Sequence, residues 1–284
     1  MKRKCIIVPD VHGRTFWKTP VTEWLNNTDE KVIFLGDYVD PYPHEGITPE
    51  DAIETFKDIL KLKESFGDRI VLLFGNHDFH YVVEGCDSSR MDYKNYDELR
   101  KLFLEHSDWF KLAHFDEICG KNVIFSHAGI NPHWIDYNFE ILSKGQPITC
   151  ESVDSVNYEM IKVMFDGLTL KDLSDNSEMC RALFQVSCFR WGNDKYSSII
   201  WCDVIELMLE SKKLDAAQIF GHTQRQSEPV RNGDDYDLDC RRCFYLTDEC
   251  VVLDSLTGDE VKDNGEDEMN AYKERLRLQM SLFF

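Results

Sequence analysis

The sequence predicts a layered α/β fold, in which β-strands and helices alternate along the chain. Short apolar runs of strand length recur, and amphipathic helical patterns lie between them. Each of these apolar runs ends on a cluster of polar residues. The predicted strands are Cys5–Val8, Val32–Leu35, Ile70–Phe74, Val123–Phe125 and Gln218–Phe220.

The clearest predicted helix is the segment "TPEDAIETFKDILKLKESFG". In it, Thr48 is a favourable N-cap, Pro49 suits the first helical position, and Gly67 suits the end. Apolar residues recur within the segment at helical spacing, which predicts that one face packs on the core. The same pattern predicts two further helices, over residues 96–106 and 203–214.

The 284 residues and 43% hydrophobic content suit a single domain over residues 1–284 with one large core. Residues 131–186 differ from the rest, because they are acidic, helical in pattern and free of strand-end motifs. We interpret them as a helical insertion or lid packed against the rest of the domain. After a strand at 250–254 and an acidic linker, a final amphipathic helix is expected to dock on the domain.

The formal net charge of −20 disfavours nucleic acids and acidic membranes as partners, because their phosphates need a basic face. No apolar run approaches the length of a membrane span, and the apolar part of "MKRKCIIVPD" is too short for a signal peptide. We therefore expect a cytoplasmic protein. The ten cysteines lack framework spacing, which predicts reduced thiols. Cys240 and Cys243 have no second pair and no nearby histidine, which disfavours a zinc or redox role.

The polar clusters at the five strand ends are "PDVHG", "GDYVD", "GNHD", "SHAG" and "GHT". Ligands of open α/β sheets bind outside the carboxyl ends of strands, so these clusters are expected to converge. They contain oxygen and imidazole donors and no cysteine, a mixture that suits manganese, iron, zinc or similar divalent ions. The candidate residues are Asp10, His12, Asp37, Asp40, Asn76, His77, His127 and His222.

In order and spacing, these motifs resemble those of the calcineurin-like metallophosphoesterases, specifically the phosphoprotein-phosphatase-type branch. The resemblance extends from Asp10 to His222. It implies a layered sandwich of two mixed β-sheets flanked by helices, with a two-metal site between the loop ends of the sheets.

The resemblance implies two metal sites that share Asp37. The first would consist of Asp10, His12 and Asp37, and the second of Asp37, Asn76, His127 and His222. We expect two divalent ions, with manganese favoured and iron, zinc, nickel, cobalt or magnesium as alternatives. Such ions would compensate carboxylates at buried strand ends and would attract phosphate despite the negative net charge.

The same resemblance assigns roles to His77 and Asp40. A hydroxide between the two ions would attack phosphorus in line with the leaving oxygen. His77 would protonate the departing alkoxide, and Asp40 would orient its imidazole and raise its basicity. No covalent phospho-enzyme is required.

Two departures from the family pattern leave the metal ligands intact. Gln224 stands where many metallophosphoesterases have a second histidine, in Gly-His-x-His. This difference is usual in the phosphoprotein-phosphatase branch and disfavours the purple-acid and DNA-repair nuclease branches. Pro9 stands where the branch usually has glycine. It precedes the ligand Asp10 and is expected to be tolerated.

A third departure affects substrate binding. The branch usually has an arginine directly after the second aspartate of Gly-Asp-x-x-Asp, where it binds phosphate, but this chain has Pro41. Proline offers no donor in its place. Arg190 and Arg14 are the candidate substrate-binding residues, and His44 is a further candidate from the same loop as Pro41.

The leading functional hypothesis is a metal-dependent phosphatase that hydrolyses phosphomonoesters of small molecules or phosphoproteins. The alternative within the enzymes is a hydrolase of dinucleoside polyphosphates, other phosphoanhydrides or phosphodiesters. A non-catalytic metal-binding scaffold is a third reading, disfavoured because His77 and the ligands are all present. The acidic segment 131–186 favours a small substrate over a nucleic acid, and the oligomeric state is left open.

Overall fold

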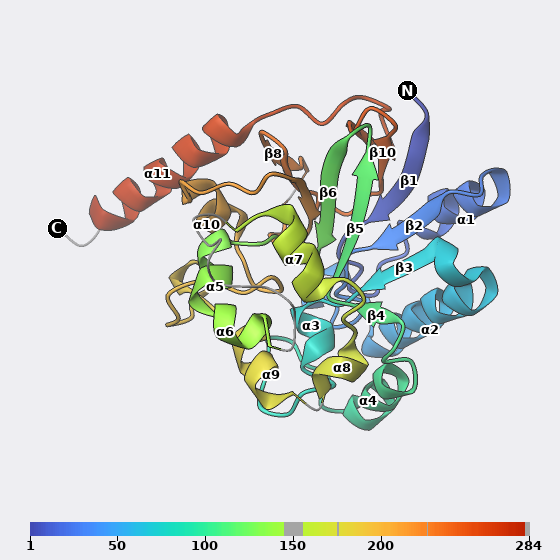
Figure 1. The fold of residues 1–284 in the computed structure, drawn as a ribbon. Coiled ribbons are helices and arrows are strands. Elements are labelled where there is room, and N and C mark those ends of the chain that lie inside the picture. The colour runs from blue at the N-terminus through green and yellow to red at the C-terminus, as the bar shows by residue number, and fades with distance from the viewer. Residues whose placement is uncertain (145–155, 175, 226, 282–284) are drawn as a thin grey trace.

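The computed structural model describes residues 1–144, 156–174, 176–225 and 227–281. Two β-sheets form its centre, and helices cover their outer faces (Figure 1). The first sheet has six strands in the order β11-β10-β1-β2-β3-β4. Strands β1 to β4 are parallel, β10 pairs antiparallel to β1, and β11 pairs antiparallel to β10. The bounds are β1 Arg3–Val8, β2 Lys31–Phe34, β3 Ile70–Leu73, β4 Phe110–Lys111, β10 Phe244–Thr247 and β11 Val252–Asp254.

The second sheet has five strands in the order β5-β6-β7-β9-β8 and is also mixed. Its strands are β5 Ala113–Ile118, β6 Lys121–Ser126, β7 Ala217–Phe220, β8 Val230–Asn232 and β9 Asp235–Asp237. All five strands predicted from apolar runs are present, in β1, β2, β3, β6 and β7. The predicted fold of two mixed sheets flanked by helices is confirmed.

Alternation along the strands explains why two sheets stack. Ile7 and Ile33 of the first sheet share an apolar cluster with Phe125 and Ile219 of the second, so these side chains fill the space between the sheets. The chain neighbours Ile6, Phe34 and Ile124 belong to a separate cluster that includes helix residues such as Phe56. Strands buried on both faces read as continuous apolar runs, which is the pattern that the sequence shows.

The helices lie in two groups around the sheets (Figure 1). The helices that precede β4 in the chain are α1 Lys18–Asn27, α2 Pro49–Phe66, α3 Asn76–Phe79 and α4 Tyr96–Glu105. Of these, the short α3 directly follows the end of β3. Helix α2 begins as predicted, because the Thr48 side chain accepts the Asp51 N–H at 3.1 Å in a capping box. The helix predicted over 203–214 ends earlier, as α10 Val204–Leu209. At its C-terminal end, Lys213 Nζ donates to the Leu207 carbonyl at 2.9 Å. This side chain therefore supplies a donor to a carbonyl of the last helical turn.

The described part of residues 131–186 is helical. It contains α5 Pro132–Tyr137, α6 Phe139–Leu142, α7 Tyr158–Phe165, α8 Leu170–Ser174 and α9 Ser177–Leu183. Trp134, Phe165 and Leu183 are fully buried in the same apolar cluster as the outer face of the first sheet. The role of this segment as an insertion or lid stays a prediction, and residues 145–155 and 175 of it lie outside the described residues.

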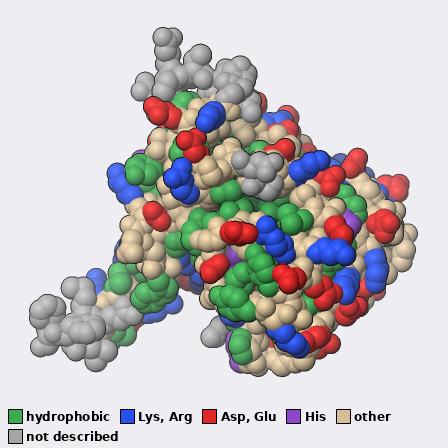
Figure 2. Space-filling model, turned by 90° about the horizontal axis from the view of Figure 1, so that it is seen from below, with side chains coloured by type: hydrophobic (Ala, Val, Ile, Leu, Met, Phe, Trp, Pro, Cys, Tyr) green, Lys and Arg blue, Asp and Glu red, His purple; other side chains and the backbone are tan. Residues whose placement is uncertain are grey.

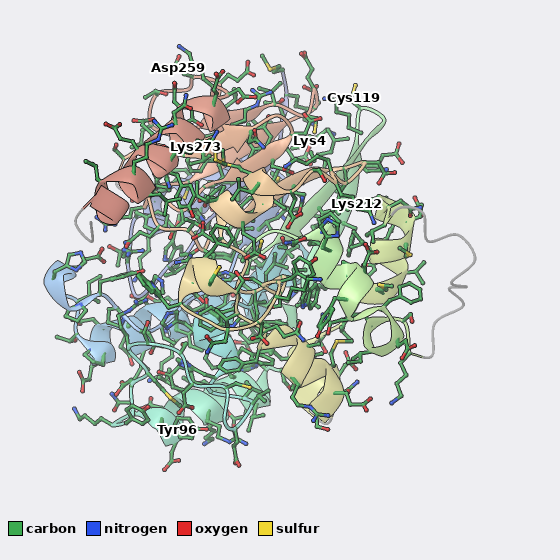
Figure 3. All side chains as sticks on the ribbon, turned by 90° about the vertical axis from the view of Figure 1, so that its left-hand side faces the viewer. Lys4, Tyr96, Cys119, Lys212, Asp259 and Lys273 are labelled. Carbon is green, nitrogen blue, oxygen red and sulfur yellow. The ribbon has the colours of Figure 1, made fainter. Side chains whose placement is uncertain are left out.

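The final helix, α11 Gly265–Ser281, projects from the body of the molecule (Figure 1). Met269 and Tyr272 in its first half pack against the cluster formed by α10 and β7, which confirms that this half docks on the domain. Lys273 of α11 and Asp259 before it lie at the opposite end from Tyr96 of α4 (Figure 3). None of the described helices combines the length and apolar composition that a membrane span requires.

Candidate metal centre and active site

The five polar clusters meet where the carboxyl ends of the parallel strands of both sheets converge. Direct contacts join them across the two sheets. The backbone N–H of His222 donates to Asp10 Oδ1 at 3.0 Å, and that of His77 donates to Asp37 Oδ1 at 3.0 Å. The Gly221 N–H donates to the His127 carbonyl at 2.8 Å. The predicted convergence of residues from distant parts of the chain is thus present in the structure.

Two groups of donor side chains share Asp37. One group is Asp10, His12 and Asp37, and the other is Asp37, His127 and His222; within each, one donor atom per residue lies within 4.8 Å of the others. The Asn76 amide oxygen lies 3.2 Å from His127 Nε2, so it joins the second group. These are the two sets of ligands that the family resemblance implied, and their assignment to metal ions stays a prediction.

Close backbone approach explains the glycines of this region. A Cβ on Gly75 would lie 2.1 Å from Asp37 Oδ1, and a Cβ on Gly221 would lie 2.3 Å from Asp10 Oδ1. Any side chain at either position would therefore displace a candidate ligand.

Four of the predicted site residues have left-handed backbone conformations. The φ angles are +44° at His12, +53° at Asp37, +58° at Asp40 and +72° at His222. Residues other than glycine rarely adopt such angles, and functional sites are where they concentrate. Here they turn the chain sharply at strand ends, so that the side chains point to one centre.

The hydrogen bonds of His12 and His127 fix their tautomers. His12 Nδ1 lies 2.8 Å from the Val39 carbonyl, and His127 Nδ1 lies 2.9 Å from the Leu35 carbonyl. Because a carbonyl only accepts, each Nδ1 carries the ring proton, and a neutral ring then leaves a lone pair on Nε2. These Nε2 atoms face the Asp37 carboxylate at 3.5 and 3.6 Å. Acceptors buried against one another repel unless a cation lies between them, so this donor set fits metal ions.

Burial and mutual charge shift the pKa values of these groups. Burial raises the pKa of Asp10. It acts the same way on Asp37, but the neighbouring imidazoles, above all that of His127, outweigh it and lower the pKa. Burial lowers the pKa of His12 to about 3 and that of His222 well below its usual value. Both rings are therefore neutral near pH 7, the form that ligates a metal.

Asp78 is a buried residue whose role the sequence did not indicate. Its carboxylate accepts the backbone N–H groups of Gly75, Asp37 and Tyr38 at 2.8, 2.7 and 2.9 Å. It thereby ties the end of β2 to the end of β3 and holds the two loops that carry Asp37 and Asn76. The motif "GNHD" contains Asp78, but only the fold shows what it binds.

His77 and Asp40 form a buried pair beside the two donor groups. His77 Nδ1 lies 2.8 Å from Asp40 Oδ2. Asp40 Oδ1 also accepts a hydrogen bond from the Tyr81 hydroxyl. His80 Nε2 lies 2.9 Å from Asp40 Oδ2, but the geometry of this contact is not that of a hydrogen bond. Burial acts to raise the pKa of Asp40, but the neighbouring imidazoles of His77 and His80 outweigh it and lower the pKa. Asp40 is thus an ionised anchor that can orient the His77 ring.

An arginine that sequence reasoning missed, Arg90, lies at the other nitrogen of His77. Its Nη2 is 3.1 Å from His77 Nε2, its Nε donates to the Asp40 carbonyl at 3.2 Å, and its guanidinium stacks 3.8 Å above the Tyr42 ring. Its φ of +64° shows that the chain turns sharply to place it. Arg90 has no carboxylate ion-pair partner in the part of the chain that the structure describes.

The two arginines predicted to bind substrate have protein partners in this structure. The Arg14 guanidinium forms a bidentate pair with Glu45, at 2.7 and 3.0 Å, and is nearly buried. Arg190 donates to the His222 carbonyl at 2.6 Å and lies 3.3 Å from Asp203. Their roles at the phosphate stay predictions. His44, the further candidate, is largely exposed.

None of the described cysteines belongs to a donor group. Within the described ranges they are free thiols, and Cys240 and Cys243 are buried. Burial raises the pKa of both thiols, so they are protonated and poor metal ligands.

Two curated proteins are similar to parts of the chain. A probable serine/threonine-protein phosphatase of Encephalitozoon cuniculi (strain GB-M1) is 29% identical over 133 residues, covering 44% of this chain and 26% of that protein. A symmetrical bis(5'-nucleosyl)-tetraphosphatase of Pseudomonas fluorescens (strain SBW25) is 29% identical over 113 residues, covering 37% of this chain and 35% of that protein. The chain therefore matches about a third or less of the length of either relative.

A solved structure supports the fold. The cold-active protein-tyrosine phosphatase of a psychrophilic Shewanella species has a TM-score of 0.55 at 13% identity, over 92% of this chain and 81% of that chain. The family model described as calcineurin-like phosphoesterase matches residues 4–226, which contain all five strand-end motifs. The chain therefore belongs to the calcineurin-like phosphoesterase family, as the order of its motifs predicted.

Proposed function

We propose that this protein is a metal-dependent phosphatase that hydrolyses phosphomonoesters. The observation that carries the proposal is the placement of the His77–Asp40 pair directly beside two buried donor groups that share Asp37. Asp10, His12 and Asp37 would hold one ion, and Asp37, Asn76, His127 and His222 would hold the other. We propose manganese for both positions, since oxygen and imidazole donors without thiolate suit it.

When bound, such ions supply positive charge for the phosphoryl oxygens and lower the pKa of an attacking water. The protein would supply the proton for the leaving group. His77 Nδ1 donates to Asp40, so the free nitrogen, Nε2, is the one that would carry this proton. Asp40 cannot rotate away, because Tyr81 and His80 contact the same carboxylate.

Arg90 is placed to bind the phosphoryl group. In this structure its guanidinium donates to His77 Nε2, so that nitrogen accepts and carries no proton. A phosphate between the two side chains would draw the guanidinium to itself and free Nε2 for protonation. Charge-assisted pairs of arginine with phosphate are strong and directional, and Arg90 is free of a competing carboxylate within the described residues. It therefore suits the role left open by Pro41.

A second candidate function is hydrolysis of dinucleoside polyphosphates. One observation favours it: a symmetrical bis(5'-nucleosyl)-tetraphosphatase is among the curated relatives. The chemistry at phosphorus would use the same residues, and only the leaving group would change from an alkoxide to a phosphate. A phosphate leaving group needs less help from His77, because it is a weaker base than an alkoxide.

One experiment separates these functions. With excess Mn²⁺, phosphate release should be measured on p-nitrophenyl phosphate, an alkyl monoester and a phosphoserine peptide. Release of nucleoside diphosphate should be measured on diadenosine tetraphosphate, because its symmetrical hydrolysis frees no inorganic phosphate. The proposal expects kcat/KM to be highest for a monoester or the peptide. A preference for the tetraphosphate would establish the second function instead. Binding of two Mn²⁺ ions without turnover of any substrate would establish a non-catalytic scaffold.

A further inference from the structure

Two buried aspartates lie behind the first donor group, and no motif of the sequence pointed to them. Strand β9 ends at Asp237, and Asp239 follows two residues later. Their side chains are 0% and 1% exposed. Asp237 Oδ2 and Asp239 Oδ1 have no hydrogen-bond partner within the ranges that the structure describes. A buried carboxylate oxygen without a partner is costly, so each needs an explanation.

The backbone places Asp239 next to Asp10. The Leu238 N–H donates to the Phe220 carbonyl at 2.8 Å, and the Arg225 N–H donates to the Asp239 carbonyl at 2.7 Å. The segment after β9 therefore runs beside the turn that carries His222. A Cβ built on Gly221 would lie 2.3 Å from Asp10 Oδ1 and 3.7 Å from the Asp239 Cβ, so the two aspartates flank this glycine.

Asp239 forms no ion pair with a positive side chain among the described residues, whether lysine, arginine or histidine. The nearby Arg14 guanidinium already binds both oxygens of Glu45. Burial, followed by the charges of Asp10 and Asp237, raises the pKa of Asp239. The surroundings therefore disfavour a charged Asp239 unless a cation is also present.

We propose that Asp239 is a further carboxylate of the Asp10–His12–Asp37 metal site and helps to hold the cation through a bound water. It would act through water because its oxygens do not belong to the group of donors within 4.8 Å of one another. Gln224 leaves this site one histidine short of the Gly-His-x-His pattern, so a second-sphere carboxylate would restore part of the missing attraction. Outer-sphere partners of this kind typically change metal affinity about 10–100-fold.

This inference rests on the proposed metal binding. One experiment tests metal binding and the role of Asp239 separately. Mn²⁺ affinity of the metal-free protein is measured by titration calorimetry, and Tm is measured with and without Mn²⁺. For Asp239→Asn, we expect Kd at one of the two sites to rise about 10–100-fold. We also expect no loss of Tm in the metal-free protein, because the carboxylate that is replaced has a buried oxygen without a hydrogen-bond partner among the described residues.

Asp235→Asn is the matched control. Asp235 lies on β9, the strand that precedes Asp239, but its carboxylate accepts a hydrogen bond from Gln218 at 3.2 Å and lies 3.6 Å from Lys213 Nζ. Its replacement should leave both Mn²⁺ affinities unchanged and lower Tm. Asp239→Ser provides a second, smaller replacement that should weaken Mn²⁺ binding in the same way.

Three results would overturn the inference. Wild-type Mn²⁺ affinity in both Asp239 variants would show that this carboxylate does not serve the metal site. A lower Tm of metal-free Asp239→Asn would show that the carboxylate stabilises the protein by itself. Failure of the wild-type protein to bind Mn²⁺ would reject the metal site and the proposed function together, and this outcome differs from the first two.

Discussion

The two sides of the site are assembled in different ways. The metal side, formed by Asp10, His12, Asp37, Asn76, His127 and His222, uses residues at the ends of five strands. The acid side is formed by His77, Asp40, His80, Tyr81 and Arg90. The last three of these lie within residues 80–90, a stretch that contains no strand. The hydrogen-bonded sheets fix the position of the first set. The second set depends on where one loop folds back.

Replacement of Asp37 tests the metal side most severely. Asp37 is the one residue common to both donor groups, so Asp37→Asn should weaken both sites at once. We expect loss of at least one bound Mn²⁺ and a fall in kcat/KM of about 10³-fold or more, because the charge that stabilises the phosphoryl group is lost. Metal analysis and phosphate release measure the two effects. Asp68→Asn, at an exposed aspartate, is the control.

Two tightly bound ions in Asp37→Asn would contradict the bridging role. They would show that the remaining donors of each group suffice and that Asp37 serves the fold.

Replacement of His77 separates the acid side from the metal side. His77→Asn should keep both ions, since His77 belongs to neither donor group that contains Asp37. The rate should fall by about 10²–10⁴-fold for an alkyl phosphate, the range typical of acid–base groups. The loss should be smaller for p-nitrophenyl phosphate, whose leaving group needs no proton. Steady-state rates for both substrates, with metal content alongside, make the measurement.

Equal losses for the two substrates would reject proton transfer by His77. His106→Asn is the control, because His106 stacks on Trp109 just after α4 and belongs to neither donor group. It should lose little activity with either substrate.

Replacement of Arg90 tests the part of the acid side that the sequence did not indicate. Arg90→Ala should lower kcat/KM by about 10–100-fold with normal metal content, as expected for a charge-assisted bond of about 1.5–3 kcal/mol. Arg90→Lys should recover part of this loss, because the charge stays and the planar fork is removed. Kinetics at several substrate concentrations, with metal analysis of each variant, provide the data.

Arg190→Ala and Arg14→Ala belong in the same series, since the sequence predicted these two as substrate-binding residues. A larger loss in either of them than in Arg90→Ala would return the phosphate contact to that arginine. Because both have protein partners, their Tm must be measured as well.

The metal side was predictable because strand ends have fixed neighbours. Five apolar runs marked the strands, and the residue after each run had to lie at the carboxyl edge of a sheet. The strands that were missed are mostly of two to four residues, such as β4 Phe110–Lys111 and β8 Val230–Asn232. Runs this short show no usable periodicity. Their places come from pairing, of β4 with β3 far earlier in the chain and of β8 with the adjacent β9.

The acid side was predictable only where a motif contained it. His77 and Asp40 belong to the motifs "GNHD" and "GDYVD". Arg90 belongs to "EGCDSSR", which has no spacing that points to an active site. Its position depends on tertiary bonds, among them Arg90 Nε to the Asp40 carbonyl and Arg100 to the Tyr81 carbonyl. The same limit applies to Asp239, which is buried where the segment after β9 runs beside the turn that carries His222.

The smallest effect on rate is expected from the groups that hold Asp40. The Tyr81 hydroxyl donates to Asp40 Oδ1 and also accepts the Asp92 N–H at 2.9 Å. Tyr81→Phe removes both bonds without changing the shape of the ring. Asp40 keeps His77 and His80 as neighbours, so the imidazole stays oriented and kcat should fall less than about tenfold. The free energy of unfolding should fall by about 1.5–3 kcal/mol, because a hydrogen bond to a buried charged group is lost.

Denaturant unfolding and steady-state kinetics on one preparation measure the stability and the rate of Tyr81→Phe. A loss of activity as large as that of His77→Asn, with the stability unchanged, would show that Tyr81 acts in the reaction itself. An unchanged rate with reduced stability would show that His77 and His80 alone are enough to hold Asp40 in place.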